Sequence, residues 1–366
     1  MNPPANLLTA RWAARLDDRQ TVLSGAGVYP LLALLARYAT GPARDELHAV
    51  APTPQPPVDS PTTRLATGFW SRAGLPLGQR WRTELDASIR GELTGDPAVD
   101  QPRLDRWAHR HTDGLIDRMP LQIGPGTALV LANALTVLVD WTTPFQPARS
   151  EPTTGPWRGR RLAGLHRPGG NPAALRVADT AAGPVSLLTV TGTADVDVLL
   201  VLGPAGQPPA RVLPAALGAL DHPTTLPPAV GPGVSEETVE AYDDRPELLV
   251  RTVGFTVTGD HDLLHHADLF GLATAARDGD HFPDVSPQLS VSAARQSAMA
   301  EFTATGLRAA AVTAIGLRAG GAAPPRATVR RRRWCLDVDR PFGFLAVHRP
   351  TGLVLVAGWV TEPAPG

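Results

Sequence analysis

The chain has 366 residues, 43% of them hydrophobic and 19% charged, which is enough to bury a large core. Its formal net charge of −1 at pH 7 argues against a general nucleic-acid or membrane partner. A single cysteine, Cys335, excludes an intramolecular disulfide framework and any cysteine-based metal cluster.

All 34 basic residues are arginine, in a chain rich in Ala, Gly and Pro. This lysine-free composition indicates the codon bias of a GC-rich, prokaryotic genome, so we give isolated arginines no functional weight. No positively charged start leads into an apolar run at the N-terminus. We therefore expect no signal peptide and a cytoplasmic protein, with export by another route left open.

Helices are predicted mainly in the first third of the chain. Leu8, Trp12 and Leu16 recur at four-residue spacing, which is typical of an amphipathic helix. Residues 29–39 are apolar nearly all round and predict a buried helix, followed by a shorter one at 43–50 and a Pro-rich loop at 52–62. Around 103–119 one helical face carries four apolar residues, with Gly114 as a break: Leu104, Trp107, Leu115 and Ile116.

Strands predominate from residue 127 onwards. The apolar run 127–139 is too short to span a bilayer and fits a central strand covered on both faces. Further strands are predicted at 185–190, 195–203 and 247–257, then a helix at 260–271, and finally two strands joined by a tight turn at 350–352. The layout is α+β.

Motifs for catalysis are weak. His261 and His265 lie four apart around Asp262, but a zinc protease would need Glu there and a third ligand, so solvated histidines explain the pattern as well. No phosphate-binding loop, dinucleotide fingerprint or Gly-x-Ser-x-Gly turn is present. The run Arg330–Arg333 could bind phosphates, but a solvated or protease-sensitive loop explains it better. We expect no enzyme, no cofactor and no metal.

Several segments together resemble the serpin family. Residues 106–119 and 129–145 resemble its helix, Thr-x-Gly and central strand, with Asn133, Trp141, Pro144 and Phe145 at the family's spacing. Residues 289–314 resemble the strand and hinge before the reactive loop, and 336–347 resemble the C-terminal signature with Asp339–Phe342 in register. Residues 23–35 resemble the helix that begins at a serine, here Ser24.

The resemblance implies one domain over residues 1–366, with three β-sheets, about nine helices and an exposed reactive loop at about 306–335. In the family's inhibitors a protease cuts this loop, which then inserts as an extra central strand and drags the acylated protease along. The resemblance also assigns a cluster that controls opening of the sheet, in which glutamine replaces the usual histidine: Ser24, Asn133, Trp141 and Gln296.

The hinge departs from the inhibitory pattern. It comprises Ala304, Thr305, Gly306, Leu307, Arg308, Ala309, Ala310 and Ala311. Ala304 replaces a glutamate, and Gly254 aligns with its lysine partner, so both charges are absent together. Leu307 replaces a threonine, Gly343 interrupts the apolar signature, and the loop is longer than usual in the family.

Alternation along the hinge supports insertion. From Leu307 to Ala319 one parity is uncharged, whereas the other carries Arg308 and Arg318. Alternate residues of a strand face opposite sides, so only one register avoids burying two guanidinium groups. A linker or an Ala-rich helical turn remains the alternative, because two charges share a parity by chance half the time.

The scissile bond is left open by the long loop. Counting from the hinge indicates Gly320–Gly321, with Arg318 nearby, whereas counting back from Pro341 indicates Arg330. Arginine on the acyl side would suit a trypsin-like protease, and the Gly-Gly bond a subtilisin-like one. We favour a cut before Pro324 and Pro325, because proline cannot donate to a sheet ladder.

The sequence therefore predicts a serine protease inhibitor that acts as a suicide substrate, is a monomer and binds neither nucleic acid nor membrane. The main alternative is a non-inhibitory protein of the same fold, a binding scaffold, a carrier or a recruited biosynthetic factor. A weaker third hypothesis is an enzyme with a pocket between the sheets.

Overall fold

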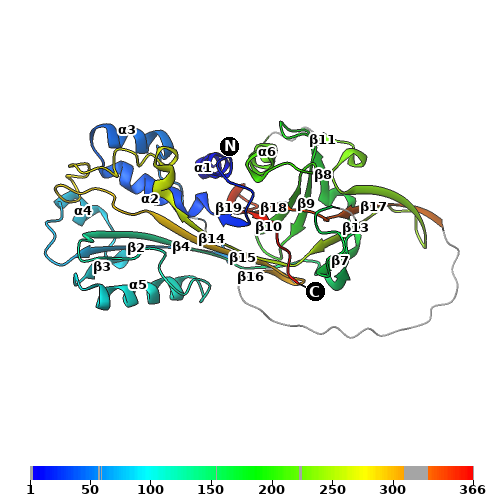
Figure 1. Ribbon diagram of the computed structural model, residues 1–366, viewed down its shortest axis with the longest axis horizontal. Coiled ribbons are helices and arrows are strands. Elements are labelled where there is room, and N and C mark those ends of the chain that lie inside the picture. The colour runs from blue at the N-terminus through cyan, green and yellow to red at the C-terminus, as the bar shows by residue number, and fades with distance from the viewer. Residues whose placement is uncertain are drawn as a thin grey trace.

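The computed structural model describes residues 3–56, 58, 60–153, 155–221, 225–308 and 329–365. Within these ranges the chain forms seven α-helices, four short 3-10 helices and four β-sheets (Figure 1). This mixture agrees with the predicted α+β class, but the sheet and helix counts differ from the expected three and about nine.

The helices gather mainly in the N-terminal part, as the sequence predicts. The α-helices are α1 (Pro4–Ala13), α2 (Gly25–Tyr38), α3 (Gly41–Val50), α4 (Gln79–Glu84), α5 (Pro97–His111), α6 (Pro209–Asp221) and α7 (Ala267–Phe270). The 3-10 helices are η1 (Ala87–Ile89), η2 (Pro172–Ala174), η3 (Pro228–Val230) and η4 (Leu263–His266). None of these described helices is long and apolar enough to cross a membrane.

Helix α2 is the buried helix that the sequence predicts. Ser24 caps its N-terminus, because its Oγ accepts a hydrogen bond from Gly27 N at 2.9 Å. Tyr29 and Leu32 are buried in the main core. The cap fixes where the helix starts, and the apolar faces fix where it packs.

Helix α5 ends earlier than its apolar pattern suggests. It stops at His111, and the hydroxyl of Thr112 donates back to Ala108 O at 2.8 Å. Gly114 has a φ of +80°, which a residue with a side chain rarely adopts. Leu115 and Ile116 therefore belong to the segment after the helix.

The two larger sheets contain twelve strands. The seven-stranded sheet runs β1 (Thr21–Leu23), β19 (Leu353–Val360), β18 (Phe342–His348), β10 (Val196–Leu202), β9 (Val185–Thr191), β8 (Leu175–Ala178) and β11 (Thr225–Leu226). The five-stranded sheet runs β12 (Val234–Ala241), β17 (Val329–Asp337), β13 (Glu247–Val253), β7 (Leu162–Gly170) and β6 (Gln146–Ser150). The predicted C-terminal hairpin is confirmed as β18 and β19, both buried along their length.

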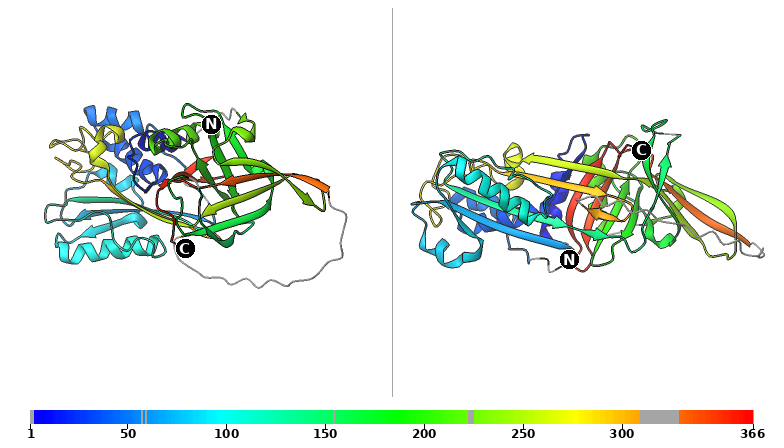
Figure 2. Two further views of the ribbon diagram at one scale, coloured as in Figure 1. Left: turned by 45° about the vertical axis from the view of Figure 1, so that its right-hand side comes forward. Right: turned by 90° about the horizontal axis from the view of Figure 1, so that it is seen from below.

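The two smaller sheets form one layer, which explains the extra sheet. One contains β3 (Arg90–Leu93), β2 (Thr63–Arg72) and β4 (Leu129–Val137), and the other contains β14 (Phe255–Asp262), β15 (Arg295–Phe302), β16 (Gly306–Arg308) and β5 (Val139–Asp140). Only Leu138 separates β4 from β5. Figure 1 and the right-hand view of Figure 2 show the strands of both sheets side by side. The predicted strand at 127–139 is thus confirmed as β4, interrupted just before β5, but β4 lies at the edge of its three-stranded sheet and only alternate residues are buried, so it is not the strand covered on both faces that the sequence suggests.

Gly343 lies where α6 packs on β18. A Cβ at this position would lie 2.6 Å from Leu213 Cδ2, which is closer than real contacts. The side chain of Leu213 in α6 therefore occupies the space beside Gly343 that a larger residue at this position would fill. Leu213 and Gly343 are both buried.

Candidate functional site

Strand β16 places the predicted hinge inside the central layer. Leu307 pairs with Val139 of β5 on one side and with Phe302 of β15 on the other. No more than 3% of the surface of any of the three residues is exposed. Leu307 therefore faces the core, which is the parity expected for it, and residues 306–308 are a strand rather than an exposed loop.

The turn before β16 is held by Trp141. Its indole Nε1 donates to Thr303 O at 3.0 Å, and its backbone N donates to Thr305 O at 2.9 Å. Phe145 N donates to Ala304 O at 2.8 Å. Trp141 thus binds the hinge residue Thr305, and Phe145 binds Ala304.

Gly306 lies where no side chain fits. A Cβ there would be 2.2 Å from Val139 O, so the close approach of β5 and β16 requires glycine. A Cβ at Gly254 would lie 3.4 Å from Phe302 O, which puts Gly254 at the end of β15 close to the turn that carries Ala304. Gly254 and Ala304 are therefore two small uncharged residues near the same end of β15.

Beyond β16 the central layer is open between β4 and β15. In the described part of the chain no backbone pairing joins these two strands. Instead, residues of both strands line two adjoining cavities of about 310 and about 120 Å³. The apolar lining includes Leu31, Leu121, Leu129, Leu131 and Leu263. We call this space the slot.

A polar cluster lies where α2 meets the slot. Ser24 exchanges two hydrogen bonds with Gln296, each 2.9 Å long, and donates from Oγ to Leu355 O at 2.6 Å. Asn133 of β4 donates from Nδ2 to Gly27 O at 2.7 Å. The structure thus brings the predicted residues Ser24, Asn133 and Gln296 together, with Gln296 acting as both donor and acceptor.

The side-chain carbonyl of Asn133 is unsatisfied. Its Oδ1 is buried and has no hydrogen-bond partner among the described residues. An acceptor buried in this way costs about 1–3 kcal/mol relative to a bonded one. The slot therefore contains a specific position at which a hydrogen-bond donor would be stabilised.

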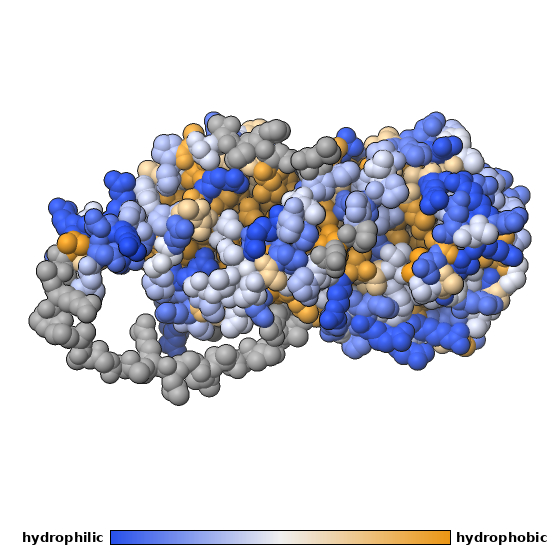
Figure 3. Space-filling view, turned by 180° about the vertical axis from the view of Figure 1, so that it is seen from behind, coloured by the Kyte–Doolittle hydropathy of each residue, from blue (hydrophilic) through white to orange (hydrophobic). Residues whose placement is uncertain are grey.

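Residues 330–333 are a strand and not the solvated loop that the sequence suggests. They belong to β17, where Arg330 pairs with Glu240 of β12 and Arg333 with Glu237. The tip of this ribbon projects from the body in Figure 1, and its surface is mostly hydrophilic in Figure 3. Acidic partners from β12 and β13 explain why four consecutive arginines can lie in a sheet.

Glu247 of β13 is the centre of this charge network. Its carboxylate contacts Arg331 Nη2 at 3.1 Å and Arg333 Nε at 2.5 Å, while only 10% of its side chain is exposed. Arg333 also contacts Glu237 at 3.0 Å. We call Glu247, Arg331 and Arg333 the clamp, because it fixes β17 to β13.

Cys335 lies beside the clamp. Burial and the hydrogen bond from Sγ to Glu237 Oε1 raise the pKa of its thiol to about 11. The thiol is therefore protonated at neutral pH and unreactive, as expected for a packing residue.

The predicted helix at 260–271 is confirmed only in part, because residues 260–262 belong to β14 and the helical part consists of η4 followed by α7. His261 lies in β14, where it pairs with Gln296, and His265 lies in η4, which Asp262 caps by accepting from Leu264 N at 3.1 Å. His261 and His265 therefore do not share a helical face. Within the described ranges no group of three or more His, Cys, Asp or Glu residues could hold a metal ion.

Comparison with known proteins supports the same family. No protein-family profile matches the chain. The chain is similar to three proteins of Oryza sativa subsp. japonica: "Putative serpin-Z8" (28% identity over 39% of this chain and 40% of that protein), "Putative serpin-Z6C" (37% over 26% and 22%) and "Serpin-Z2B" (27% over 40% and 40%). These similarities support the serpin family. Each match to a rice serpin spans two fifths or less of that relative's length.

Several predicted residues of the serpin site are placed and others are not. Ser24, Asn133 and Gln296 meet beside the slot, Trp141 holds the hinge, and Arg330 lies in β17. Of the hinge, residues 304–308 precede or form β16. The remaining predicted positions lie outside the described residues: Ala309, Ala310, Ala311, Arg318, Gly320 and Gly321. The sequence reasoning missed the clamp, although the acidic residues at 236, 237, 240 and 247 are visible in the sequence.

Proposed function

We propose that this chain is a serpin-type serine protease inhibitor, which traps its target when the cleaved segment after β16 enters the slot. The observation that carries the proposal is the position of β16. It already lies between β5 and β15, and the slot continues from it in the same layer. A segment that continues β16 can extend the sheet without a change of direction.

Strand β16 pairs with β15 on one side and with β5 on the other. If both pairings continue in the same register, each inserted residue has a defined neighbour in β15 and in β4. Every second residue after Leu307 would face the core. Ala311 would lie between Leu135 of β4 and Ala298 of β15, and Ile315 would lie beside Leu131. Leu131 and Leu135 are only partly buried in the structure, and an inserted strand would cover them. Burial of apolar surface, at roughly 25 cal/mol per Å², favours this step.

The same register gives Thr313 the polar position in the slot. It would lie between Asn133 and Gln296, facing the core. A threonine hydroxyl can donate a hydrogen bond, and Asn133 Oδ1 is the buried acceptor without a partner. Thr313 is the one polar side chain of the core-facing parity from Leu307 to Ala319, so one register alone meets this acceptor.

Residues on the other face of the inserted strand must be small as well as uncharged in the middle of the strand. Three β4 residues on that face are buried, Val130, Ala132 and Ala134, and the first two belong to a cluster with Leu104 and Ala108 of α5. Ala310, Val312, Ala314 and Gly316 would lie alongside them. Arg308 and Arg318 fall at the two ends of this stretch, so the solvent-facing side expected from the sequence is confined to its ends.

The proposed reaction uses the target's own catalytic serine. The serine Oγ attacks the carbonyl carbon of the residue before the scissile bond, that bond breaks, and the new amino terminus leaves. This chain remains joined to the protease as an acyl ester, and insertion separates the ester from the protease's hydrolytic machinery before water attacks. The inhibitor supplies no catalytic residue.

The position of Arg330 favours a cut earlier in the segment. Arg330 is paired in β17, whereas a protease needs an extended and accessible substrate. A cut at Gly320–Gly321, or after Arg318, would free a segment long enough to fill the slot. We therefore propose a trypsin-like or subtilisin-like target, with the inhibitor acting as a cytoplasmic monomer.

Incubation with trypsin and with subtilisin tests the proposal. Trapping gives a covalent adduct that survives denaturing electrophoresis. Ala311→Arg places a guanidinium on the core-facing parity and is expected to turn the inhibitor into a substrate, which is cut without an adduct. Ala323→Arg lies after the proposed cut and is the matched control; it is expected to retain the adduct.

A different outcome would change the assignment. Cleavage of the unchanged chain by both proteases without any adduct, and without a rise in melting temperature, would favour the non-inhibitory alternative. An adduct that is unaffected by Ala311→Arg would contradict the proposed register.

A further inference from the structure

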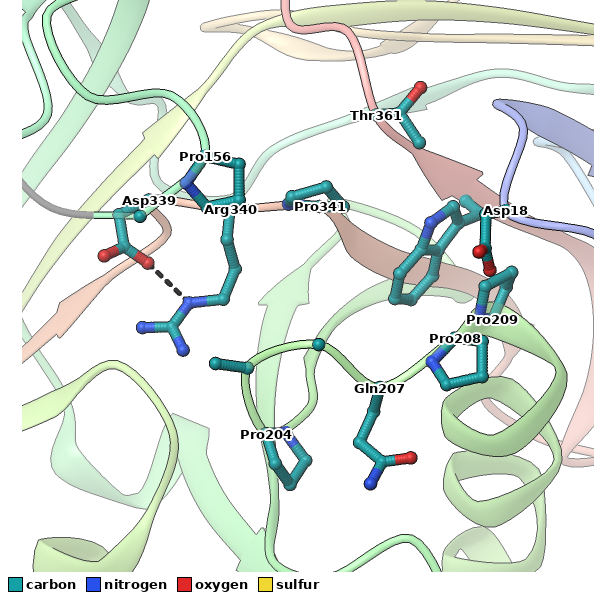
Figure 4. Close-up of a pocket in the computed structure, with 14 residues that line it drawn as sticks. Asp18, Pro156, Pro204, Gln207, Pro208, Pro209, Asp339, Arg340, Pro341 and Thr361 are labelled. Atoms are coloured by element: carbon teal, nitrogen blue, oxygen red, sulfur yellow. Dashed lines mark hydrogen bonds and ion pairs between the residues drawn. The ribbon is translucent and has the colours of Figure 1, made fainter.

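A cavity away from the slot has the features of a small-molecule site. It has a volume of about 430 Å³ and lies at the end of the seven-stranded sheet, where β10 leads into α6 and β17 leads into β18 (Figure 4). Volumes of this order are usual for small-molecule pockets.

The walls of the cavity are rigid. Five of the lining residues are proline: Pro156, Pro204, Pro208, Pro209 and Pro341. Each proline fixes its own φ, and the indole of Trp359 is held in β19, with 4% of the residue exposed. Such walls lose little conformational entropy on binding, which favours a preformed site.

A cationic side chain, Arg340, lies on one wall of the cavity. Arg340 Nε donates to Asp339 Oδ1 at 2.7 Å, and this bond orients the guanidinium. Figure 4 shows the guanidinium extending towards the cavity. Its two Nη groups have no hydrogen-bond or ion-pair partner in the described part of the chain. They can therefore bind both oxygens of a carboxylate, which is the geometry that arginine prefers.

An anionic side chain, Asp18, lies on the opposite wall. Asp18 follows α1, and Figure 4 shows it across the cavity from Arg340, beside Pro209. Asp18 has no hydrogen bond or ion pair with any described residue and is exposed. Although Asp339 offsets the charge of Arg340, the Nη groups offer hydrogen-bond donors at one end of the cavity and Asp18 offers a carboxylate at the other, with proline and tryptophan surface between them.

We propose that this cavity binds a short apolar peptide with free ends. Its carboxylate would bind the Nη groups of Arg340, its ammonium would bind Asp18, and its side chains would contact Trp359 and the prolines. A purely anionic ligand would be repelled by Asp18, and a purely cationic ligand would leave the Nη groups of Arg340 unused. The zwitterion satisfies both ends. The site does not depend on the slot, so this proposal is independent of protease trapping.

Titration calorimetry with three probes tests the proposal: leucyl-phenylalanine, its N-acetyl derivative and its C-terminal amide. The free dipeptide is expected to bind, and blocking either end is expected to lower the affinity about tenfold, which corresponds to one charge-assisted contact. Arg340→Gln is expected to remove the discrimination against the amide, and Asp18→Asn the discrimination against the acetylated peptide.

Matched controls separate binding from folding. Arg160→Gln removes an arginine that pairs with Glu362 and does not line the cavity, so its probe affinities are expected to equal those of the unchanged chain. Circular dichroism verifies that each variant is folded. No binding of leucyl-phenylalanine at millimolar concentration would overturn the proposal, as would equal affinity for all three probes.

Discussion

Glu247 and Arg333 face each other across the parallel strands β13 and β17, with Arg333 Nε 2.5 Å from Glu247 Oε1. The pair matters because β17 joins the segment after β16 to the C-terminal hairpin. The clamp therefore attaches β17, which precedes the C-terminal hairpin, to the five-stranded sheet.

Glu247→Gln is expected to destabilise the protein measurably. The carboxylate is largely buried and contacts two arginines, so its neutralisation removes one ion-pair partner from each guanidinium group, whose other partners, Asp243 and Glu237, are more exposed. Charged hydrogen bonds of this type contribute about 1.5–3 kcal/mol, and we expect a loss near the lower end because both arginines are partly exposed. Urea denaturation measures the change in the free energy of unfolding.

Glu236→Gln is the matched control for the clamp. Glu236 forms an ion pair of 2.8 Å with Arg332 in the same two strands, but 40% and 61% of these side chains are exposed. Exposed pairs contribute at most about 1 kcal/mol. If both variants lost the same stability, the special role given to the buried carboxylate would be wrong.

The thiol of Cys335 is expected to resist alkylation. Because its pKa is raised to about 11, very little thiolate exists at pH 8. Iodoacetamide is therefore expected to label the native chain far more slowly than the urea-unfolded chain, as followed by mass spectrometry. Fast labelling of the native protein would show that β17 separates from its neighbours.

The sequence predicts those parts of the fold that depend on local patterns. The apolar run in α2, the continuous apolar strands β18 and β19 and the core-facing parity of Leu307 each reflect residues close in sequence. Leu307 is buried in the structure with the parity that the alternation requires. Helix and strand periodicity is sufficient in these cases.

Other parts depend on partners that are far away in sequence. Arg330–Arg333 form a strand only because Glu237, Glu240 and Glu247 lie beside them, roughly ninety positions earlier in the chain. His261 looks helical by spacing, but its pairing with Gln296 makes it part of a strand. The slot and the unsatisfied Asn133 Oδ1 could not be predicted, because each depends on where two separate strands lie.

Acid is expected to destabilise the protein through His261. The imidazole contacts Val22 O at 2.9 Å and packs edge-on against Trp12 at 4.9 Å. Burial lowers the pKa of His261 below its ordinary value, partly offset by the bond to Val22 O and the charge of Asp260, while His266 lowers it further. The folded protein therefore favours the neutral ring.

The pH window follows from this direction. The contribution of neutral His261 is complete above the unfolded-state pKa, about 6.5, and is lost as the pH falls from there through the lower folded-state pKa. The free energy of unfolding is expected to fall between pH 7.5 and pH 5, and His261→Gln is expected to reduce that fall. The exposed His265→Gln is the control, and an equal pH dependence in all three proteins would contradict the assignment.

Thr313→Val tests the polar contact proposed for the inserted strand. Valine has nearly the shape of threonine but no hydroxyl, so insertion would leave Asn133 Oδ1 unsatisfied in the cleaved form as well. We expect the cleaved variant to be less stable than the cleaved unchanged chain by about 1–3 kcal/mol, whereas the uncleaved forms should be equally stable. Guanidinium chloride denaturation of both forms measures these differences.

Ile315→Val is the control for this prediction. It shortens a core-facing side chain without removing a polar group, and its expected cost, about 0.5–1.5 kcal/mol, should be independent of Asn133. Combining each substitution with Asn133→Ala separates the two effects: the cost of Thr313→Val should disappear in that background, and that of Ile315→Val should persist. A persistent cost of Thr313→Val would place its hydroxyl elsewhere and would contradict the register.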